Sequence, residues 1–418
     1  MRFAYFDAEK LPDSTLSRNV AALKKYRTHV MRVFAERDVT APEYSLAHIT
    51  DPALHDQLDV LKLKFKGVKH VILVGIGGSS LGAEAVHSVL DTGKTTLHVL
   101  DTIAPYQVDR LLKTLASVRS VTNVAVCVVS KSGGTTETLV NASVILAALE
   151  QKFKKAIYAQ TIFIGNAKTD FMKAGKRLGA TCVSMPETVG GRYSVATEVG
   201  LVPLALLGHD VDAFMGGVLD SASEEFESVT AEHAARLQYY LTKGFTHYNF
   251  FAFEPRLAAL GAWYRQLQAE SLGKASDITG KKVRGGFVPT VSTAVELHSI
   301  GQLYLSGLPG VYTDFVVFDD EETDFTIPKK GLAKAYSKYS AQEVATAIYG
   351  GVVEAYQEKD LSYRSTIFDD GNLAYSLGLF MGMRMRETMY LAHLMRINAF
   401  DQPNVELYKT LTKKILGL

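Results

Sequence analysis

Short apolar runs rich in β-branched residues recur along this chain, and they restrict its fold more than any other feature. In the first half the runs are VKHVILVGI (residues 68–76), TLHVL (96–100), VAVCVVS (124–130) and TIFIG (161–165). Each is separated from the next by a stretch long enough for a helix. Runs that are apolar on both faces are typical of central strands in a parallel sheet covered by helices. We therefore predict right-handed βαβ crossovers and an α/β fold.

A second alternation of the same kind follows after Leu207. Its expected elements are FTHYNFFAF (245–253), a helix through 263–268, VYTDFVVF (311–318), a helix at 341–358 and STIFDD (365–370). Two successive units of this kind predict two doubly wound parallel sheets that face one another. We expect a helical N-terminal segment at 1–45, a first domain at 46–207, and a second domain at 208–418 that ends in a C-terminal helical arm.

The charge balance and the cysteines exclude several classes of protein. The chain of 418 residues carries 45 Lys and Arg against 44 Asp and Glu, so its formal net charge is +1. That balance provides no field for a polyanion, and we do not expect nucleic acid as a partner. Cys127 and Cys182 lie in apolar runs without metal-ligand spacing, which is typical of a reduced, cytosolic protein.

The C-terminal apolar stretch at 373–397 does not predict a membrane span. A bilayer-spanning helix needs about 20 predominantly apolar residues. This stretch is interrupted by charged residues, namely Arg384, Arg386, Glu387 and Arg396. The N-terminus also lacks an apolar core of signal-peptide length. We predict a buried helix at 373–397 and no membrane partner.

The first predicted strand runs into a glycine-rich loop, GIGGSSLG at 75–82, which a helix should follow. Glycines let the backbone approach a ligand closely, and free N–H groups at a helix start can bind an anion. A dinucleotide site is disfavoured, because Ser80 stands where the third glycine of that fingerprint is expected. The segment 78–82 also satisfies G-x-S-x-G, which would make Ser80 a hydrolase nucleophile, although no convincing Asp and His partners follow in the expected order.

A second loop, SKSGGTTET at 130–138, places five hydroxyl groups, two glycines and a lysine before another apolar helix. Such clusters are common in turns and helix caps. Here, however, the cluster recurs at the carboxyl end of a second parallel strand, where open α/β sheets bind ligands. Two hydroxyl-rich loops favour a site for a monophosphate over a single activated serine.

Charged and titratable residues elsewhere are candidates for the chemistry. Arg192 follows a Gly-Gly turn, so a permanent cation can reach a ligand beside a closely approaching backbone. Glu270 lies four residues after Gln266, so both share one helix face, and a partly desolvated carboxylate there could act as a proton-transfer base. Taken alone, His298 and Lys409 are typical of a packed histidine and a solvated helix lysine. We find no metal-ligand spacing and expect neither a metal nor a cofactor.

In this order the segments resemble the phosphoglucose isomerase (glucose-6-phosphate isomerase) family. The resemblance covers residues 71–409 and rests on the blocks GIGGSSLG, SKSGGTTET, VGGRYS, QLQAESLGK, the segment around His298, and FDQPNVELYK. The first two blocks alone indicate only a sugar-isomerase-type (SIS-type) phosphate-binding domain, whereas their combination with the others is specific to the family. The resemblance implies two SIS-type domains, aldose–ketose isomerisation of glucose 6-phosphate and fructose 6-phosphate, and a homodimer.

The resemblance also assigns roles to individual residues. It implies that the substrate phosphate is held by Ser79, Ser130, Ser132 and Thr135, with the backbone of Gly78 and Lys131 nearby. Glu270 matches the base that moves a proton between C1 and C2 of the open-chain sugar, and Arg192 matches the cation beside the enediolate. Ring opening is assigned to His298, contributed by the second subunit, and to Lys409. The polar side chains that line the site are Gln266 and Gln402.

The residue types fit that chemistry. A carboxylate can accept and return one proton on the same face of a planar intermediate, and a fixed cation stabilises the charge that develops on the sugar oxygens. Histidine can donate a proton to the ring oxygen near neutral pH. Two alternatives stay open. The motifs do not show how stereochemistry at C2 is read, so the chain could be a dual-specificity phosphoglucose/phosphomannose isomerase, or it could be a non-catalytic sugar-phosphate-binding regulator.

Overall fold

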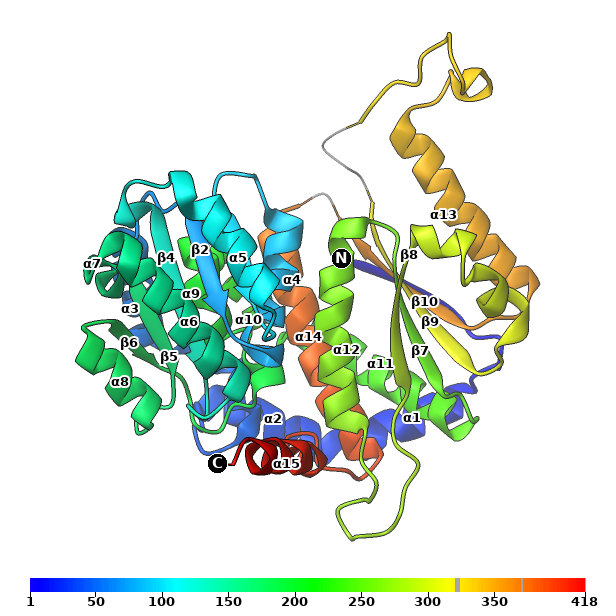
Figure 1. Ribbon diagram of the computed structural model, residues 1–418. Helices are drawn as coiled ribbons and strands as arrows, with labels where there is room; N and C mark the ends of the chain where they lie inside the picture. The colour runs from blue at the N-terminus through cyan, green and yellow to red at the C-terminus, as the bar shows by residue number, and fades with distance from the viewer. Residues whose placement is uncertain (320–323, 370, 418) are drawn as a thin grey trace.

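Two five-stranded β-sheets with helices on their faces form the framework of the computed structural model, which describes residues 1–319, 324–369 and 371–417 (Figure 1). The first sheet is parallel throughout, in the order β3-β2-β4-β5-β6. Its strands are β2 (His70–Val74), β3 (Thr96–Leu100), β4 (Val124–Ser130), β5 (Thr161–Gly165) and β6 (Thr181–Ser184). The strands predicted in this half are confirmed, and β6 adds one that the sequence did not reveal.

The two faces of the first sheet pack against different helices. Its helices are α3 (Pro52–Lys64), α4 (Leu81–Leu90), α5 (Pro105–Thr114), α6 (Thr136–Phe153), α7 (Ala156–Ala159), α8 (Asp170–Leu178) and α9 (Glu198–Leu206). Val71 and Leu73 of β2 join the core that contains buried residues of α3, α4 and α9. Ile72 and Val74 join the core on the side of α5, α6 and α8. Because both faces are buried, the strand reads as a continuous apolar run in the sequence.

The second sheet has the order β1-β10-β9-β7-β8 and is parallel except at the β1 edge. Its strands are β1 (Arg2–Phe6), β7 (His247–Ala252), β8 (Val288–Thr293), β9 (Val311–Phe318) and β10 (Tyr363–Phe368). The strands predicted in this half are confirmed as β7, β9 and β10. Asp370, the last residue of the predicted 365–370 strand, lies outside the described residues. The predicted pair of doubly wound sheets is therefore confirmed.

The prediction of a helical segment at 1–45 is wrong for its first residues. Residues Arg2–Phe6 pair antiparallel with β10 and complete the second sheet. Only then do two helices follow, α1 (Asp13–Ala22) and α2 (Lys24–Glu36). A run of five residues is too short for its period to reveal a strand. The pairing that makes it a strand comes from far along the chain, at residues 363–367 of β10.

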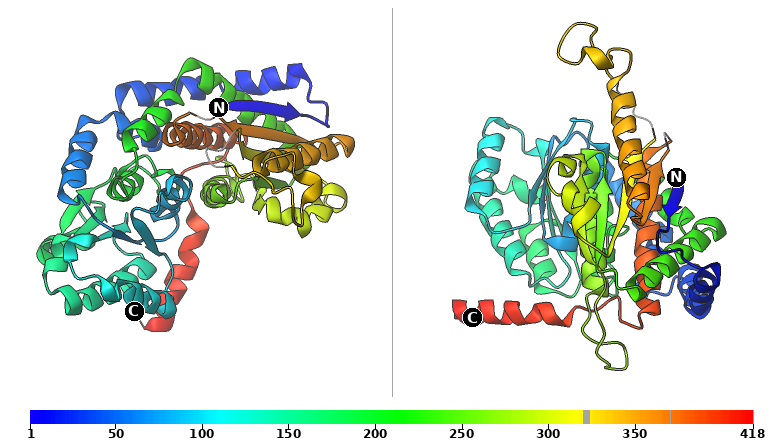
Figure 2. Two further views of the ribbon diagram at one scale, coloured as in Figure 1. Left: turned by 90° about the horizontal axis from the view of Figure 1, so that it is seen from above. Right: turned by 90° about the vertical axis from the view of Figure 1, so that its right-hand side faces the viewer.

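Helices fill the space between the two sheets, as the view from above in Figure 2 shows. The helices of the second unit are α10 (Val211–Asp220), α11 (Glu224–Thr242), α12 (Ala258–Leu272), α13 (Ala341–Glu358), α14 (Leu373–Leu394) and α15 (Glu406–Leu416). Residues 376–392 of α14 are all buried, which confirms the predicted buried helix. Within the described ranges, no helix is both long enough and apolar enough to cross a membrane.

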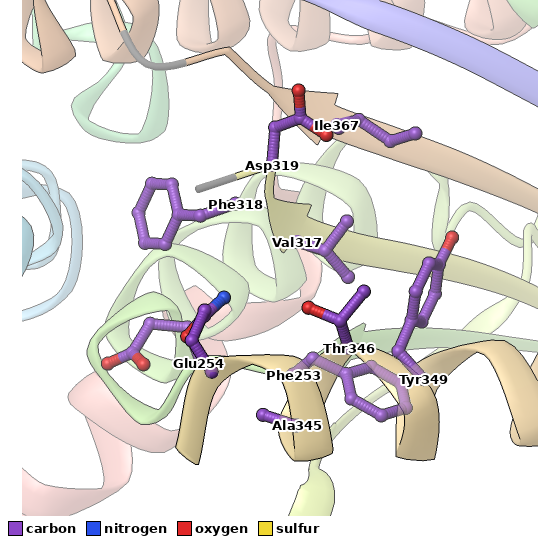
Figure 3. A pocket seen from close by; sticks show the side chains of 10 residues that line it. Phe253, Glu254, Val317, Phe318, Asp319, Ala345, Thr346, Tyr349 and Ile367 are labelled. Atoms are coloured by element: carbon purple, nitrogen blue, oxygen red, sulfur yellow. The ribbon is translucent and has the colours of Figure 1, made fainter. Parts of the chain in front are cut away.

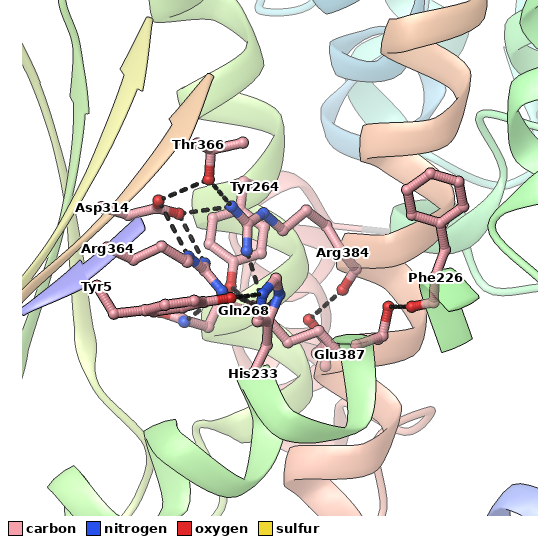
Figure 4. A network of polar contacts seen from close by, with 12 residues as sticks. Tyr5, Phe226, His233, Tyr264, Gln268, Asp314, Arg364, Thr366, Arg384 and Glu387 are labelled. Atoms are coloured by element: carbon pink, nitrogen blue, oxygen red, sulfur yellow. Dashed lines mark hydrogen bonds and ion pairs between the residues drawn. The ribbon is translucent and has the colours of Figure 1, made fainter. Parts of the chain in front are cut away.

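A network of buried ion pairs accounts for charged residues inside α14 (Figure 4). Arg384 contacts Asp314 of β9 at 2.7 Å and Glu387 at 2.8 Å. Arg364 of β10 contacts the same two carboxylates, each at 2.7 Å. Tyr264 of α12 donates a hydrogen bond to Glu387 at 2.6 Å. The network therefore ties α12 to α14 and to the second sheet.

The strand order of the first sheet creates a crevice at the carboxyl ends of β2 and β4. These strands are neighbours, but the chain leaves β2 for β3 on one side and leaves β4 for β5 on the other. Connections that diverge in this way leave a gap where open α/β sheets bind ligands. The two hydroxyl-rich loops, at 75–82 and 130–138, begin at this point.

Candidate active site

The first glycine-rich loop meets two other sequence blocks. A Cβ atom added at Gly78 would lie 2.1 Å from the carbonyl carbon of Gly191, so the two Gly-Gly turns touch and Gly78 tolerates no side chain at the contact. Gly77 has φ of +61°, and a Cβ there would lie 2.8 Å from Gln266 Nε2. The loop after β2, the Gly190–Gly191 turn and the helix α12 therefore converge on one point.

Arg192 is the centre of this convergence. It is 2% exposed, and its guanidinium group donates hydrogen bonds from all three nitrogens. Nε donates to Ser271 Oγ at 2.8 Å, and Nη1 donates to Glu270 Oε2 at 3.1 Å and to Gln402 Oε1. Nη2 donates to the carbonyl oxygens of Ala399 at 2.5 Å and Asp401 at 3.1 Å. The cation joins α12 to the segment that precedes α15.

Glu270 occupies the last turn of α12, and its carboxylate is partly accessible. Its Oε1 accepts a hydrogen bond from Gln266 Nε2 at 2.9 Å, while Oε2 faces Arg192. The Glu270 side chain is 32% exposed, whereas that of Arg192 is 1% exposed. A small molecule can thus reach the carboxylate while the cation stays in the protein interior. The structure brings Glu270, Gln266, Arg192 and Gln402 together, as the sequence predicts.

The second loop is folded by its own hydroxyl groups. Ser130 Oγ accepts a hydrogen bond from the Gly133 N–H at 3.1 Å and donates one to Thr135 Oγ1 at 3.3 Å. Ser132 Oγ accepts from the Gly134 N–H at 3.2 Å. Burial lowers the pKa of Lys131, and the positive charge of Arg192 lowers it further, against the opposite effect of Glu187. The shape of the loop is therefore set by hydrogen bonds among its own residues.

Lys409 lies on α15, at the border of this region. Figures 1 and 2 show α15 turning back from the second unit to lie beside the first. Lys409 Nζ forms an ion pair with Glu406 at 2.7 Å, and its side chain is 45% exposed. The bond to Glu406 raises the pKa of Lys409, and the charge of Glu137 adds to this. Glu137 belongs to the second loop, at 130–138, so one charge of that loop acts on Lys409.

His298 is not brought to this group within one chain. The end of α12 lies beside the start of β8, because the Gly286 N–H donates to the Leu272 carbonyl at 3.0 Å. Strand β8 then runs for 6 residues, which span roughly 20 Å. His298 ends a short 3₁₀ turn beyond the far end of β8. It is exposed, and its side chain makes no hydrogen bond or ion pair with another residue within the described ranges.

Ser80 lacks the geometry of a hydrolase nucleophile. It is 1% exposed, so its hydroxyl group does not reach the surface of the loop. The titratable group beside it is Glu84 of α4, whose pKa is raised by burial. A nucleophilic serine would need an exposed Oγ and a histidine base. The structure favours a packing role for Ser80.

The carboxyl edge of the second sheet contains a separate cavity of about 140 Å³ (Figure 3). It lies between α13 and the ends of β7 and β9, and its lining includes Phe253, Glu254, Phe318, Asp319 and Tyr349. None of the predicted site residues lines it. Within the described residues, no group of three or more His, Cys, Asp or Glu side chains is arranged to hold a metal ion.

Comparison with known families decides the assignment of the chain. A family model described as phosphoglucose isomerase matches residues 6–417. The chain belongs to the phosphoglucose isomerase family. Known members of similar sequence include a glucose-6-phosphate isomerase of Thermus thermophilus. It is 31% identical over 362 residues, which cover 84% of this chain and 84% of the relative. That of Campylobacter jejuni is 27% identical over 422 residues, which cover 96% of this chain and 99% of the relative.

Solved structures agree with the family assignment. A hypothetical protein, also from Thermus thermophilus, superposes with a TM-score of 0.85 at 28% identity and covers 99% of this chain and 100% of that one. A glucose-6-phosphate isomerase from Chlamydia trachomatis gives a TM-score of 0.82 at 17% identity, with 99% and 88% coverage, which shows a shared fold. The predicted phosphoglucose isomerase family and its two-domain α/β fold are both confirmed.

Sequence reasoning missed residues that hold the site together. Ser271 binds Arg192, and Lys274 Nζ donates to the carbonyl oxygens of Glu270 and Asp401, both at 2.6 Å. Tyr193 binds Ser271 at 2.9 Å. All three lie in the family blocks VGGRYS and QLQAESLGK, and Tyr193 and Ser271 directly follow the predicted residues Arg192 and Glu270. The signal was therefore present, but spacing alone does not reveal a contact between two blocks.

Proposed function

We propose that this chain interconverts glucose 6-phosphate and fructose 6-phosphate through a cis-enediolate, with Glu270 as the base that moves the proton between C1 and C2. One observation carries the proposal. The accessible carboxylate of Glu270 faces the buried Arg192 cation at 3.1 Å, next to two hydroxyl-rich loops at the carboxyl edge of a parallel sheet. The known relatives named glucose-6-phosphate isomerase support the choice of substrate pair.

The proposed reaction balances with these residues alone. Glu270 takes the proton from C2 of the open-chain aldose, the C–H electrons form the C1=C2 bond, and negative charge moves onto O1. The O2 proton then passes to O1, which leaves the negative charge on O2. The C2=O2 bond forms as the C1=C2 electrons take the proton from the Glu270 carboxylic acid onto C1, which gives the ketose and regenerates the carboxylate. Arg192 stabilises the enediolate charge, because a cation in a water-poor site acts more strongly than one in water.

The phosphate supplies binding energy away from the reacting carbons. We propose that the backbone of Gly78, the loop hydroxyls and Lys131 hold it, with hydroxyls from Ser79, Ser130, Ser132 and Thr135. Gln266 and Gln402 would contact the sugar chain. We assign ring opening to His298 and Lys409. His298 would have to come from a second subunit, since in one chain it lies beyond the far end of β8.

A coupled assay with fructose 6-phosphate tests the proposed function. We expect turnover of fructose 6-phosphate to glucose 6-phosphate and none of unphosphorylated fructose, because fructose lacks the group that the loops would bind. Absence of turnover rejects the enzyme. Tight binding of the sugar phosphate without proton exchange at C2 in deuterated water would instead identify a regulator. Turnover of mannose 6-phosphate would identify the dual-specificity alternative.

A hybrid dimer should recover activity from two inactive variants if His298 is shared. In a mixture of His298→Ala and Glu270→Gln subunits, one of the two sites of each hybrid combines an intact Glu270 with an intact His298. We expect each pure variant to be strongly impaired and the remixed sample to regain a measurable part of the wild-type kcat. A stable, active monomer by mass measurement in solution, or no recovery after confirmed subunit exchange, contradicts the shared site.

Replacing Lys131 with methionine should weaken substrate binding more than catalysis. A lost charge-assisted hydrogen bond to a phosphate costs about 1.5–3 kcal/mol, so we expect the KM for fructose 6-phosphate to rise by about 10- to 100-fold with a small change in kcat. Lys155→Met is the matched control, because Lys155 is an exposed lysine of the same domain. An unchanged KM in Lys131→Met would show that the ammonium group of Lys131 does not bind the substrate phosphate.

A further inference from the structure

The guanidinium group of Arg192, the proposed cation of the site, is bound by a pair of hydrogen-bonded, buried hydroxyl groups. Ser271 Oγ accepts the Arg192 Nε hydrogen bond at 2.8 Å and lies 2.9 Å from the Tyr193 hydroxyl. Ser271 and Tyr193 are both 0% exposed. Water therefore does not compete for these bonds, and each group depends on the other for its hydrogen bond.

The rest of the guanidinium group is also fixed, on the side away from Glu270. Nη2 is occupied by the carbonyl oxygens of Ala399 and Asp401. The Tyr193 ring lies 5.5 Å from the Arg192 Cζ and packs against Phe400 at 5.3 Å between ring centroids. A guanidinium group is planar and rigid, so fixing Nε and Nη2 determines where Nη1 points. Here Nη1 points at Glu270.

We propose that Ser271 and the Tyr193 hydroxyl are positioning residues that aim Arg192 Nη1 at the enediolate in the reaction proposed above. Neither needs to touch the substrate. Ser271 follows Glu270 in the same helical turn, so one turn of α12 both carries the base and aims the cation. The inference rests on the proposed function. The orientation of the Arg192 guanidinium group affects the rate only if negative charge develops on the substrate during the reaction.

Loss of the Ser271 hydroxyl would leave Arg192 Nε without an acceptor in a site that excludes water. A buried donor without a partner is costly, so the guanidinium plane would turn toward another acceptor. Such a turn moves Nη1 away from the point where charge develops, and a small misplacement of a catalytic group can cost about 100-fold in rate. Ground-state binding depends mainly on the phosphate and changes little. The effect should therefore appear in the transition state.

The test compares two sugar-phosphate ligands in Ser271→Ala and Tyr193→Phe. A five-carbon aldonate phosphate carries a carboxylate in place of the enediolate oxygens, whereas glucitol 6-phosphate is an uncharged polyol at the same atoms. In Ser271→Ala we expect kcat to fall by about 10- to 100-fold and affinity for the aldonate phosphate to fall by a similar factor. Affinity for glucitol 6-phosphate should change less than about twofold, since it makes no use of the cation. In Tyr193→Phe we expect the same pattern, with smaller falls in kcat and in affinity for the aldonate phosphate.

Matched controls and a second variant make the outcome decisive. Ser143→Ala and Tyr336→Phe remove hydroxyl groups from exposed residues and should leave all three measurements unchanged. Glucitol 6-phosphate binding reports that a variant is folded. If Ser271→Ala does not fold, the comparison stands on Tyr193→Phe, which keeps the ring against Phe400.

Two results overturn the inference. Equal loss of affinity for both ligands would assign a general structural role to the pair, and unchanged kcat in both variants would show that Arg192 needs no aiming. Either result leaves an active wild-type enzyme and hence the proposed function. An inactive wild-type protein rejects the proposed function itself, and the inference with it.

Discussion

Glu270→Gln is expected to lower kcat for glucose 6-phosphate and fructose 6-phosphate interconversion by about 10³- to 10⁴-fold. Glutamine keeps the length and shape of the side chain, and its carbonyl oxygen can still accept the Arg192 or Gln266 hydrogen bond. It cannot accept the C2 proton at neutral pH. The variant therefore tests the proton-transfer role of Glu270 while the packing of the side chain is kept.

KM should change much less than kcat in this variant. Substrate binding in the proposed site depends on the phosphate, which the loops after β2 and β4 would hold, and neither loop contacts the Glu270 side chain through a hydrogen bond in the described residues. The measurements are the coupled assay in both directions and hydrogen exchange at C2 in deuterated water. Exchange is the sharper readout, because it reports proton removal even when ring opening limits turnover.

The control is Glu354→Gln on α13, an exposed glutamate far from the first sheet. It should retain full activity. Full activity in Glu270→Gln, or unchanged C2 exchange, would show that another group takes the proton. Loss of turnover with hydrogen exchange at C2 preserved would instead assign Glu270 a role in ring opening and not in proton transfer.

The parts of the fold that were readable from sequence depend on local signals. Strands β2 and β4 are buried on both faces, so residues 71–74 and 124–129 form unbroken apolar runs. The loops that follow them contain glycines and hydroxyls where each strand turns into a helix, and in the proposed site the phosphate would lie beside these turns. Each signal is complete within about ten residues. For this reason the first sheet, its crevice and the candidate site loops could be predicted together.

The parts that could not be predicted depend on pairs far apart in the chain. β1 is a strand only because β10, more than 350 residues later, offers its edge. The path of β8, which starts beside the end of α12 and runs away from it, is another such property, and it separates His298 from Glu270 within one chain. Sequence order cannot show this separation. Likewise the charges at Arg384 and Glu387 exclude a membrane helix, but they do not reveal their partners on β9 and β10.

Asp314→Asn is expected to destabilise the protein by about 3–5 kcal/mol, because it removes one charge from a buried network and leaves the others uncompensated. In the native network two guanidinium groups, Arg364 and Arg384, share the carboxylates of Asp314 and Glu387. Asp314 is 0% exposed. His233, beside Glu387, does not help, since burial and the Arg364 charge lower the pKa of His233 to about 4.

The same network predicts how stability depends on pH. Burial acts to raise the pKa of Asp314, but the charges of Arg364 and Arg384 together hold it below its ordinary value. A carboxylate of this kind stabilises the folded state fully above the unfolded pKa of about 3.9. The contribution is lost as the pH falls through the lower, folded pKa. Wild-type stability should therefore fall in acid between these values, and Asp314→Asn should lose part of that dependence.

Equilibrium unfolding in urea, followed by circular dichroism at pH 7 and at acid pH, measures both effects. The control is Asp109→Asn, which removes an exposed pair with Lys113 at 2.7 Å and should change stability by less than about 1 kcal/mol. A urea midpoint of Asp314→Asn equal to that of the control would mean that other groups compensate the charges of Arg364 and Arg384. Because Tyr264 connects the network to α12, we also expect Asp314→Asn to lower kcat in the fraction that stays folded. A destabilised variant with wild-type kcat would show that the network supports the fold of the second sheet without setting the position of Glu270.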